Sequence, residues 1–354
     1  MNINRYKNLQ SVAIVIPIYN VEKYLKACLD SVLAQTYRNF NVYAIDDGST
    51  DNSGNILFNY SKMDDRIHVV HQKNKGVSSA RNLAMDYITE SGKFTYIYFL
   101  DADDFIDELC IETFVKYMEL FRVDYAVCSY QTISVNKISQ NNKKSSNFKL
   151  LSNLDICEQF FNISIKNYTE YVSDSTTSLF LNNRFFRLDK IKSLRFNENF
   201  RACEDQDFLI RAFQLVERGV KIPDKLFYYR RRLSSLSNGN DVKRYDLFAY
   251  QLLYKNKNCF PSYIRIGIQK EYLRHLIQRL YYELSSSSSM ISKKNYYNYC
   301  ISILERDLEF PETYYVHKQK LILSKGFLFS LIYSYVKKLL KLLIHYSRRM
   351  RFYK

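Results

Sequence analysis

The sequence contains no closely spaced pair of cysteines. Its seven cysteines are scattered along 354 residues, an odd number without a Cys-x-x-Cys pair or a tight Cys/His cluster. Structural zinc sites need grouped ligands, and disulfide frameworks need paired cysteines. The five histidines show no ligand spacing either. We therefore predict reduced thiols, no zinc site and a cytoplasmic protein.

A long apolar run is also missing from the beginning of the chain. The first ten residues are polar, and the apolar run Val12–Ile18 that follows is short and contains Pro17. A membrane-spanning helix needs about 20 apolar residues. The run therefore predicts a strand, and neither a membrane span nor a signal peptide.

Acidic residues are scarce in the last third of the chain. Residues 1–220 carry 26 Lys and Arg against 27 Asp and Glu, whereas residues 221–354 carry 26 against 9. The net charge of +16 therefore arises in the C-terminal part. Such a local surplus indicates an anionic partner, either a membrane surface or a nucleic acid. The alternative is a solvated basic face that only keeps the protein soluble.

Strand and helix signals alternate over the first hundred residues. Runs of β-branched and aromatic residues predict strands at 12–16, 41–45, 67–70 and 96–100. Pro17 is expected to end the first strand, and Asn20 is expected to cap the helix that follows it. Runs that are apolar throughout are typical of parallel strands buried on both faces. The pattern predicts an α/β domain.

Acidic residues follow the ends of two of these strands. Asp46-Asp47 follows the second strand, and Asp101-Ala102-Asp103 follows the fourth. Ligands of open α/β sheets bind at the carboxyl edge of the strands, and two such carboxylates can supply oxygen ligands to Mg²⁺ or Mn²⁺. A triplet of this kind alone is common and usually marks a solvated turn. Asp104 beside it is expected to cap a helix beginning at Phe105.

Four motifs in a fixed order give the triplet its context. They are Pro17-Ile-Tyr-Asn20, Asp46-Asp47-Gly48-Ser49, Lys75 to Asn82, and Leu100 to Asp104. This order resembles the inverting family 2 glycosyltransferases, which have a GT-A fold and use nucleotide-diphosphate sugars. The resemblance implies a Rossmann-like GT-A domain at 1–230, followed by a basic and mainly helical region at 231–354.

The resemblance also assigns site residues. It implies that the nucleotide sugar is bound by Pro17, Tyr19, Asn20, Asp46, Asp47, Gly76, Arg81, Asp101 and Ala102. Asp47 would accept a hydrogen bond from the uracil imide, which favours a UDP-sugar. Asp103 would hold Mn²⁺ or Mg²⁺, and Asp101 would bind either the same cation or the ribose hydroxyls. Tyr19 could instead pack in the core, and Arg81 could either reach the diphosphate or hold the acidic loop in place.

An acidic pair precedes a predicted helix further along the chain. The resemblance implies that Asp205, beside Glu204, takes the proton from the acceptor hydroxyl, since an inverting transfer needs one general base. Glu204 and Asp207 are the alternatives. Acidic residues at a helix N-terminus also interact favourably with the helix dipole, and the local sequence by itself favours that interpretation.

A basic residue near the end of this domain is expected to contact the diphosphate. The run 227–237 resembles the Tyr/Arg segment that closes many of these domains. The three consecutive arginines Arg230, Arg231 and Arg232 cannot all face one site. We select Arg232 for this role.

Basic residues also dominate the end of the chain. Residues 321–354 contain eight Lys and Arg and no acidic residue. This composition predicts an interfacial amphipathic helix attracted to anionic lipid, or else a helix that packs on a neighbour or on a second copy of the chain. We expect peripheral association with the inner face of the cytoplasmic membrane and no nucleic-acid partner.

The resemblance to this family implies a metal-dependent, inverting hexosyltransferase. It would move a sugar to a saccharide or lipid-linked saccharide acceptor in the synthesis of capsule or lipopolysaccharide. An inactive, nucleotide-sugar-binding scaffold of a polysaccharide synthase complex is the alternative. A nucleotidyltransferase fits less well, because these enzymes commonly carry a glycine-rich phosphate loop near the N-terminus, where Pro17-Ile-Tyr-Asn20 has no glycine.

Overall fold

The computed structural model describes residues 10–134, 137–138, 147–161, 163–164, 169–170, 180–200, 203–231, 253, 260–284, 286 and 289–306. The chain divides into two compact units. One contains residues 1–160 and 173–242, and the other contains residues 161–172 and 243–354. The boundary expected after residue 230 stays a prediction.

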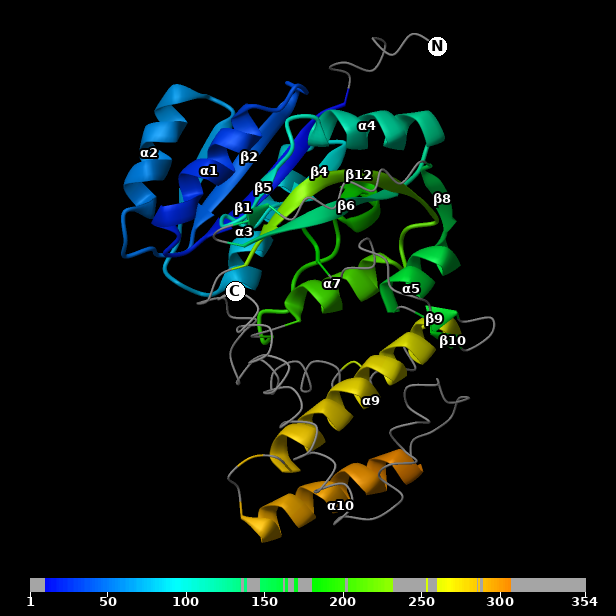
Figure 1. Cartoon of the computed structure of the whole chain (residues 1–354). Coiled ribbons are helices and arrows are strands. Elements are labelled where there is room, and N and C mark those ends of the chain that lie inside the picture. Colours follow the sequence, from blue (N-terminus) through cyan, green and yellow to red (C-terminus); the bar gives the residue numbers. More distant parts are fainter. Residues whose placement is uncertain are drawn as a thin grey trace, which may run out of the picture. The chain divides into compact units, whose positions relative to one another are not determined.

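The first unit alternates strands and helices, as the sequence predicted (Figure 1). Its elements are β1 (Val12–Ile18), α1 (Glu22–Leu33), β2 (Phe40–Asp46), α2 (Ser53–Met63), β3 (Ile67–His71), α3 (Val77–Ser91), β4 (Tyr96–Phe99), β5 (Phe105–Ile106), α4 (Cys110–Phe121), β6 (Tyr125–Ser134), β7 (Lys137–Ile138), β8 (Lys149–Ser152), α5 (Asn153–Phe161), β11 (Arg184–Arg187), α6 (Leu188–Ile191), α7 (Glu204–Ala212) and β12 (Arg218–Arg230).

One mixed sheet joins the strands of this unit. Its order is β3-β2-β1-β4-β11-β6-β12-β5, with β7 paired to β6 and β8 paired to β12. Strands β3, β2, β1 and β4 are parallel, β11 is antiparallel to both β4 and β6, and β12 is parallel to β6. Because β11 runs against both neighbours, β4, β6 and β12 point the same way. The carboxyl ends of β1 to β4 and β12 therefore meet at one edge.

The first strand continues beyond the expected end. β1 runs through Pro17 to Ile18 and pairs there with β2, whereas its pairing with β4 stops at Val15. Proline lacks an N–H group and is tolerated where a strand has lost one neighbour. The expected helix cap at Asn20 is also wrong, because the residue before α1 is Val21 and the Glu22 N–H at the start of the helix donates to the Asp51 carboxylate at 2.9 Å.

Buried aromatic rings hold the centre of the sheet. The Phe185 ring of β11 stacks on Phe114 of α4 with centroids 5.0 Å apart, and it also contacts Tyr96 and Tyr98 of β4. Large aromatic side chains contribute much of the apolar area that a core removes from water. These contacts fix the antiparallel strand β11 between two strands that run in the opposite direction.

The segment after the acidic triplet forms a strand. Phe105 and Ile106 make β5, which pairs with Phe227 and Tyr228 of β12. The helix expected to begin at Phe105 begins instead at Cys110. Pairing with a distant strand decides the conformation here, and the local apolar pattern does not reveal such pairing.

The second unit contains two short strands and two described helices. They are β9 (Ile163–Ser164), β10 (Thr169–Glu170), α9 (Ser262–Leu284) and α10 (Met290–Arg306). The described part of the C-terminal region is thus mainly helical, in agreement with the prediction. None of the described helices has both the length and the apolar character needed to cross a membrane. The basic segment 321–354 lies outside the described residues.

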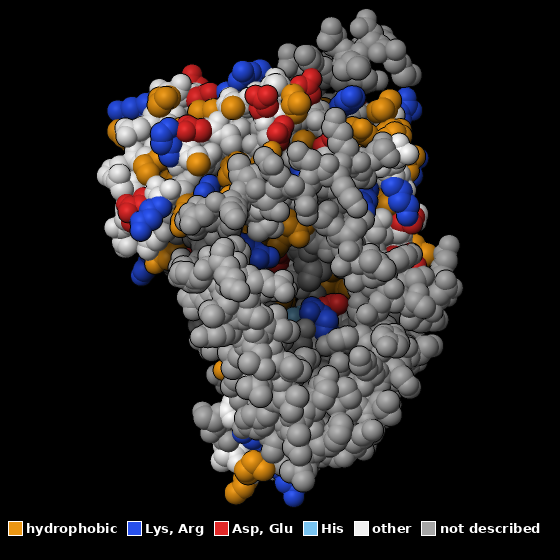
Figure 2. Space-filling model, viewed as in Figure 1, with side chains coloured by type: hydrophobic (Ala, Val, Ile, Leu, Met, Phe, Trp, Pro, Cys, Tyr) orange, Lys and Arg blue, Asp and Glu red, His pale blue; other side chains and the backbone are white. Residues whose placement is uncertain are grey.

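Charges of both signs cover the visible face of the first unit. In Figure 2, basic, acidic and hydrophobic side chains are interspersed over the part of this unit that is coloured. This mixture agrees with the nearly equal numbers of acidic and basic residues in positions 1–220. The surplus of positive charge therefore belongs to later parts of the sequence.

Gly219→Ala should destabilise the first unit. A Cβ at Gly219 of β12 would lie 2.7 Å from the Tyr125 ring and 3.2 Å from its carbonyl oxygen, so β12 must move away from β6. Overpacking of this kind costs about 1–3 kcal/mol, and we expect a lower urea unfolding midpoint. Gly54→Ala in α2 is the control, because its Cβ would make an ordinary contact at 3.6 Å. A midpoint for Gly219→Ala at or above that of Gly54→Ala would contradict this packing.

Candidate active site

Polar segments gather at the carboxyl edge of the parallel strands. β1, β2, β3 and β4 end at Ile18, Asp46, His71 and Phe99, and the four motifs of the sequence lie at or just beyond these ends. Successive parallel strands all finish at the same edge of a sheet. The fold therefore brings together motifs that are far apart in the chain.

The Asp47 carboxylate holds the turn in front of α3. Its Oδ1 accepts hydrogen bonds from the Gln72 side chain at 2.7 Å and from the Lys75 N–H at 2.8 Å, and its Oδ2 accepts one from the Gly76 N–H at 2.8 Å. Asp47 is only 3% exposed. Gly76 has φ +94°, a conformation that favours glycine. An ionised carboxylate offers about four acceptor positions, so about one remains for a ligand.

Asn20 and Asp46 organise the loop after β2. Asn20 Oδ1 accepts a hydrogen bond from the Thr50 N–H at 2.8 Å, and the Asn20 N–H donates to the Ser49 hydroxyl at 3.1 Å. Asp46 Oδ1 accepts from the Ser49 N–H at 2.9 Å, and its Oδ2 lies 2.9 Å from His71 Nδ1. Asn20 therefore bonds to the second motif and does not cap α1.

Tyr19 lies at the surface next to these loops. Its side chain is 48% exposed, which makes core packing the wrong interpretation for this residue. Pro17, at the end of β1, is half-buried. An exposed aromatic ring beside a polar loop offers a flat face on which a planar base can pack. Contact of Tyr19 and Pro17 with a nucleotide stays a prediction.

Two side chains fix the carboxylate of Asp101. Its Oδ1 accepts a hydrogen bond from the Arg81 guanidinium at 2.8 Å, and its Oδ2 accepts one from the Asn182 side-chain amide at 2.8 Å. Ala102 is buried in the core, whereas Asp101 and Asp103 on either side of it are half-exposed. Because alanine is small, position 102 can pack against the core while the carboxylates of Asp101 and Asp103 stay accessible to solvent.

The triplet and Asp104 form a cluster that fits a divalent cation. One carboxylate oxygen each from Asp101, Asp103 and Asp104 lies within 4.8 Å of the others. Oxygen-only ligands suit Mg²⁺ and Mn²⁺. The Asn182 side chain is 5% exposed, and its Oδ1 has no hydrogen-bond partner in the described structure. Adjacent carboxylates and a buried amide oxygen without a donor are stabilised by a bound cation.

Asp104 is buried and does not cap a helix. It is 2% exposed, and its Oδ1 accepts a hydrogen bond from the Arg230 N–H at 2.8 Å. Burial, reinforced by the charges of Asp103 and Asp101, raises the pKa of Asp104 well above its ordinary range. A cation bound by the cluster would favour the ionised form and oppose this shift.

Arg230 contacts the acidic triplet. From the sequence alone, it was only one of three candidate arginines. Its Nε donates to the Asp103 carbonyl oxygen at 2.9 Å, and its guanidinium lies 5.3 Å from the ring centroids of both Tyr24 and Phe105. Arg230 ends β12 at the same edge as the triplet. Arg232, which we had selected, lies outside the described residues, and its contact with the diphosphate stays a prediction.

Arg81 joins the triplet to the acidic pair at the start of α7. Its guanidinium is buried, and it contacts Asp101 Oδ1 at 2.8 Å and Glu204 Oε1 at 3.0 Å. These contacts are those of a residue that holds acidic segments in place. A contact between Arg81 and a diphosphate stays a prediction.

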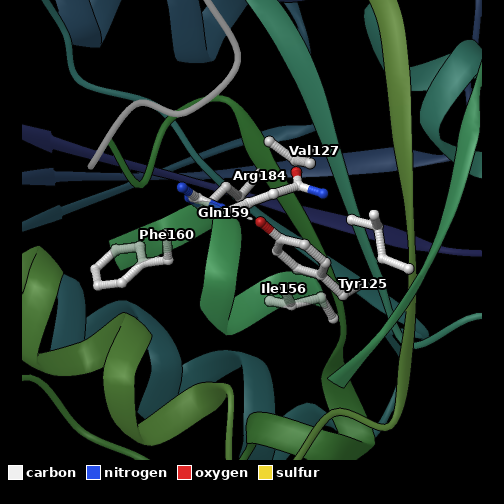
Figure 3. A pocket seen from close by; sticks show the side chains of 7 residues that line it. Tyr125, Val127, Ile156, Gln159, Phe160 and Arg184 are labelled. Carbon is white, nitrogen blue, oxygen red and sulfur yellow. Dashed lines mark hydrogen bonds between the residues drawn. The ribbon is translucent and has the colours of Figure 1, made fainter. Parts of the chain in front are cut away.

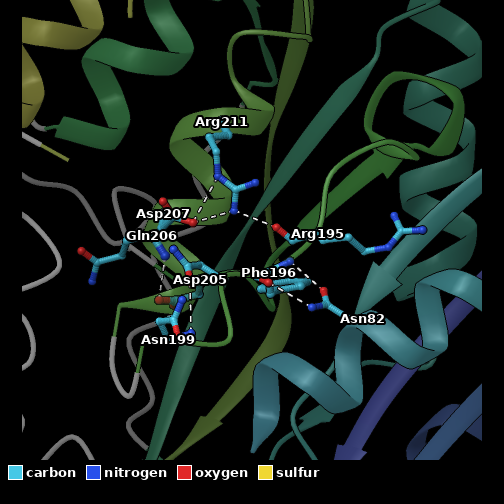
Figure 4. Close-up of polar contacts among 9 residues, drawn as sticks. Asn82, Arg195, Phe196, Asn199, Asp205, Gln206, Asp207 and Arg211 are labelled. Carbon is cyan, nitrogen blue, oxygen red and sulfur yellow. Dashed lines mark hydrogen bonds and ion pairs between the residues drawn. The ribbon is translucent and has the colours of Figure 1, made fainter. Parts of the chain in front are cut away.

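Asp205 lies in the first turn of α7 (Figure 4) and follows Glu204 in the chain. Burial raises the pKa of Asp205 to about 8, the negative charge of Glu204 adds to this effect, and the charge of Arg81 opposes it. A carboxyl group that titrates near neutral pH can exchange protons with a substrate. This environment suits the predicted role of Asp205 as a base.

Asp207 is engaged elsewhere. It is buried and forms an ion pair with Arg211 at 2.5 Å, one turn further along α7 (Figure 4). Arg211 in turn donates a hydrogen bond to the Arg195 carbonyl oxygen at 2.8 Å. Asp207 therefore has a structural environment, unlike its neighbour Asp205.

A separate pocket surrounds a buried arginine (Figure 3). It is lined by Tyr125, Val127, Leu151, Ile156, Gln159, Phe160 and Arg184. The Arg184 side chain donates hydrogen bonds to the Phe180 carbonyl oxygen and the Tyr125 hydroxyl. None of the predicted site residues lines this pocket. Its contacts are those of side-chain packing between β6, β11 and α5.

Comparisons with known proteins give the same family for this sequence. The model of the family described as Glycosyl transferase family 2 matches residues 13–186. The chain is 30% identical over 226 residues to the uncharacterized glycosyltransferase EpsJ of Bacillus subtilis (strain 168), a match that spans 64% of this chain but only 62% of EpsJ. It is 31% identical over 234 residues to glycosyltransferase GlyG of Streptococcus pneumoniae serotype 4 (strain ATCC BAA-334 / TIGR4), over 64% of this chain and 72% of GlyG.

A solved structure has the same fold. The crystal structure of residues 1–349 of S. aureus TarS in complex with UDP-GlcNAc matches with a TM-score of 0.59 and 16% identity, over 81% of this chain and 79% of that one. Together with the family match, this likeness confirms the predicted GT-A type of α/β fold. The share of identical residues is too low to carry site residues across.

Relative to wild type, the Asp205→Asn variant should become more stable as the pH rises. The folded-state pKa of about 8 lies above the value of about 3.9 for an unfolded aspartate, so the wild-type fold loses stability between pH 4 and 8. Asparagine has no such proton equilibrium. Without metal, we expect the melting temperature of the variant, relative to wild type, to increase on the order of several degrees between pH 5 and pH 9. A difference that does not change with pH would contradict the raised pKa.

Proposed function

Because this chain belongs to glycosyl transferase family 2, we propose that it transfers a sugar from a UDP-sugar to a hydroxyl group of a saccharide or lipid-linked saccharide. One observation carries the proposal. The buried Arg81 guanidinium contacts both Asp101 of the triplet and Glu204 beside Asp205. The cation-binding carboxylates and the candidate base therefore belong to one site, as group transfer between two bound substrates requires.

The hydrogen bonds of Asp47 support a uracil base. Three of its roughly four acceptor positions are used by Gln72, Lys75 and Gly76. Uracil presents one N–H group between two carbonyls, whereas guanine presents two adjacent donor groups. One remaining acceptor matches uracil and would leave a guanine donor unpaired, at a cost of about 1–3 kcal/mol. The Tyr19 ring at the end of β1 would pack on the base.

The acidic cluster would hold the cation on the diphosphate. We assign Asp103 and Asp101 as ligands of Mn²⁺ or Mg²⁺, with Asp104 beside them. When bound, the cation would offset the charge that develops on the leaving UDP. Arg230 and Asn182 keep this segment in place through the Asp103 carbonyl and the Asp101 carboxylate. Arg81 would limit the repulsion among the carboxylates before the cation binds.

Asp205 would act as the base of an inverting transfer. The proton of the acceptor hydroxyl moves to the Asp205 carboxylate while the acceptor oxygen bonds to the anomeric carbon. The bond between that carbon and the diphosphate oxygen breaks on the opposite side, and UDP leaves with the electron pair. A single displacement of this kind inverts the anomeric centre. Glu204, paired to Arg81, would position Asp205.

We place this activity in the synthesis of a cell-surface polysaccharide, such as capsule or lipopolysaccharide, at the inner face of the cytoplasmic membrane. The basic C-terminal third supports this part of the proposal, because positive charge attracts a protein to anionic lipid. A lipid-linked acceptor would be presented at that surface. The same region could instead join two copies of the chain.

A release assay with a panel of donors tests the function. We expect UDP release from one of UDP-glucose, UDP-galactose, UDP-GlcNAc or UDP-GalNAc with Mn²⁺ or Mg²⁺, and at least about tenfold less release from GDP-mannose. Asp205→Asn is the control, since it should bind UDP normally but lose transfer by about 10²-fold or more. UDP binding without turnover of any donor would favour the scaffold alternative.

Asp103→Ala tests the cation site without measuring turnover. Removing this carboxylate should weaken Mn²⁺ binding by about tenfold or more, because an oxygen ligand and a negative charge are both lost. Mn²⁺ binding can be followed by electron paramagnetic resonance, with and without UDP. Asp86→Ala, a carboxylate of α3 that pairs with Arg195, is the matched control. Equal Mn²⁺ affinity in the two variants would rule out the assignment.

A further inference from the structure

One amide side chain fastens the segment before α7 to α3. Asn82 Oδ1 accepts a hydrogen bond from the Phe196 N–H at 2.7 Å, and Asn82 Nδ2 donates to the Phe196 carbonyl oxygen at 3.0 Å (Figure 4). The amide thus satisfies both backbone groups of one residue, as a neighbouring strand would. The Phe196 ring stacks on Phe208 of α7 with centroids 4.1 Å apart. The segment is therefore fixed on two sides.

Arg195, next to Phe196, also bonds this segment to α3 and α7. Its guanidinium pairs with Asp86 of α3 at 2.7 Å, and its carbonyl oxygen accepts a hydrogen bond from Arg211 of α7 at 2.8 Å. Asp86 and Asn82 are four residues apart and lie on the same face of α3. Residues 195 and 196 are thus bound to both helices through side chains and backbone groups.

The same amide also orients an exposed carboxylate. Asn82 Nδ2 donates a second hydrogen bond, to Glu198 Oε1 at 3.0 Å. Asn82 is buried, whereas Glu198 and the neighbouring Asn199 are exposed. An exposed glutamate is usually free to change rotamer, and holding it costs conformational entropy. A buried donor that fixes an exposed carboxylate is therefore unusual for a purely solvated side chain.

Glu198 lies in the segment that precedes Asp205, the proposed base. Arg81 and Asn82 are consecutive in α3, and they bond to Glu204 and Glu198 respectively. Arg81 also contacts Asp101, on the side where the proposed donor binds. The segment that carries Glu198 and Asn199 leads instead to Asp205. Because the proposed base acts on the acceptor hydroxyl, residues that lead to it are candidates for contact with the acceptor.

We propose that Glu198, together with Asn199, binds hydroxyl groups of the acceptor saccharide, and that Asn82 is the positioning residue that holds Glu198 in place. This inference rests on the proposed function and specifies its acceptor side. The outer oxygen of Glu198 accepts hydrogen bonds from sugar hydroxyls, and the Asn199 amide both donates and accepts. Rigid attachment of the segment lowers the entropy lost when the saccharide binds.

Two substitutions separate the two roles. Glu198→Gln keeps an oxygen that can accept the Asn82 hydrogen bond but removes the charge offered to the acceptor. Asn82→Asp keeps the oxygen that accepts the Phe196 N–H but cannot donate to Glu198 or to the Phe196 carbonyl. Glu90→Gln, at an exposed glutamate near the other end of α3, is the matched control.

Kinetics and nucleotide binding are measured on the full chain. The probes are UDP with Mn²⁺ by calorimetry, hydrolysis of the preferred UDP-sugar without acceptor, and transfer to methyl glycosides of glucose, galactose, GlcNAc and GalNAc. We expect Glu198→Gln to raise the acceptor KM about tenfold with little change in kcat. Asn82→Asp should raise the acceptor KM similarly and also lower kcat. UDP affinity should stay within about twofold of wild type in all three variants, and donor hydrolysis should stay within about twofold in the control Glu90→Gln.

Other outcomes distinguish failure of this inference from failure of the proposed function. An unchanged acceptor KM in Glu198→Gln would overturn the acceptor site, and a loss of UDP affinity equal to the loss of transfer would assign the segment a structural role only. Thermal unfolding of each variant identifies a folding defect, and Glu198→Gln changes an exposed side chain with no loss of core packing. Failure of the wild type to bind UDP would instead contradict the proposed function itself.

Discussion

A single buried positive charge, that of Arg81, constrains the arrangement of the whole site. Its guanidinium contacts Asp101 from the loop after β4 and Glu204 from the start of α7. The Arg81 side chain is buried, so losing its acidic partners would leave an uncompensated charge in the interior. The loop and the helix must therefore remain on either side of Arg81. Because Arg81 belongs to α3, whose N-terminus is tied to Asp47 through Gly76, the second motif is connected to the same group.

This arrangement accumulates negative charge close to one cation. Three carboxylates lie in the cluster of Asp101, Asp103 and Asp104, and Glu204 and Asp205 add two more on the other side of Arg81. Burial raises the pKa values of Asp104 and Asp205, and the neighbouring negative charges add to this effect. Such a site costs stability and is poised to bind a divalent cation and to exchange a proton. The energetic cost and the proposed activity have the same physical origin.

The family model ends before the segment that carries the candidate base. The family model covers residues 13–186, which include the four motifs on the donor side. Glu198, Glu204 and Asp205 lie beyond that match, although α3 holds them through Arg81 and Asn82. The hydrogen bonds of Asn82 would hold the proposed acceptor segment beside the donor side.

The sequence by itself determined the strands, the edge at which they end and the motifs at that edge. Period and β-branched composition are local properties, and Asp46, Asp47 and Asp101 to Asp103 directly follow or end such runs. Only the tertiary structure decided that β1 passes through Pro17, that Asp104 is buried against Arg230, and that Asn182 and Asn82 bond to Asp101 and Glu198. Each of these depends on partners distant in the chain. A local pattern records the burial that a residue prefers, whereas the identity of its partner is fixed only when the sheet brings separate segments together.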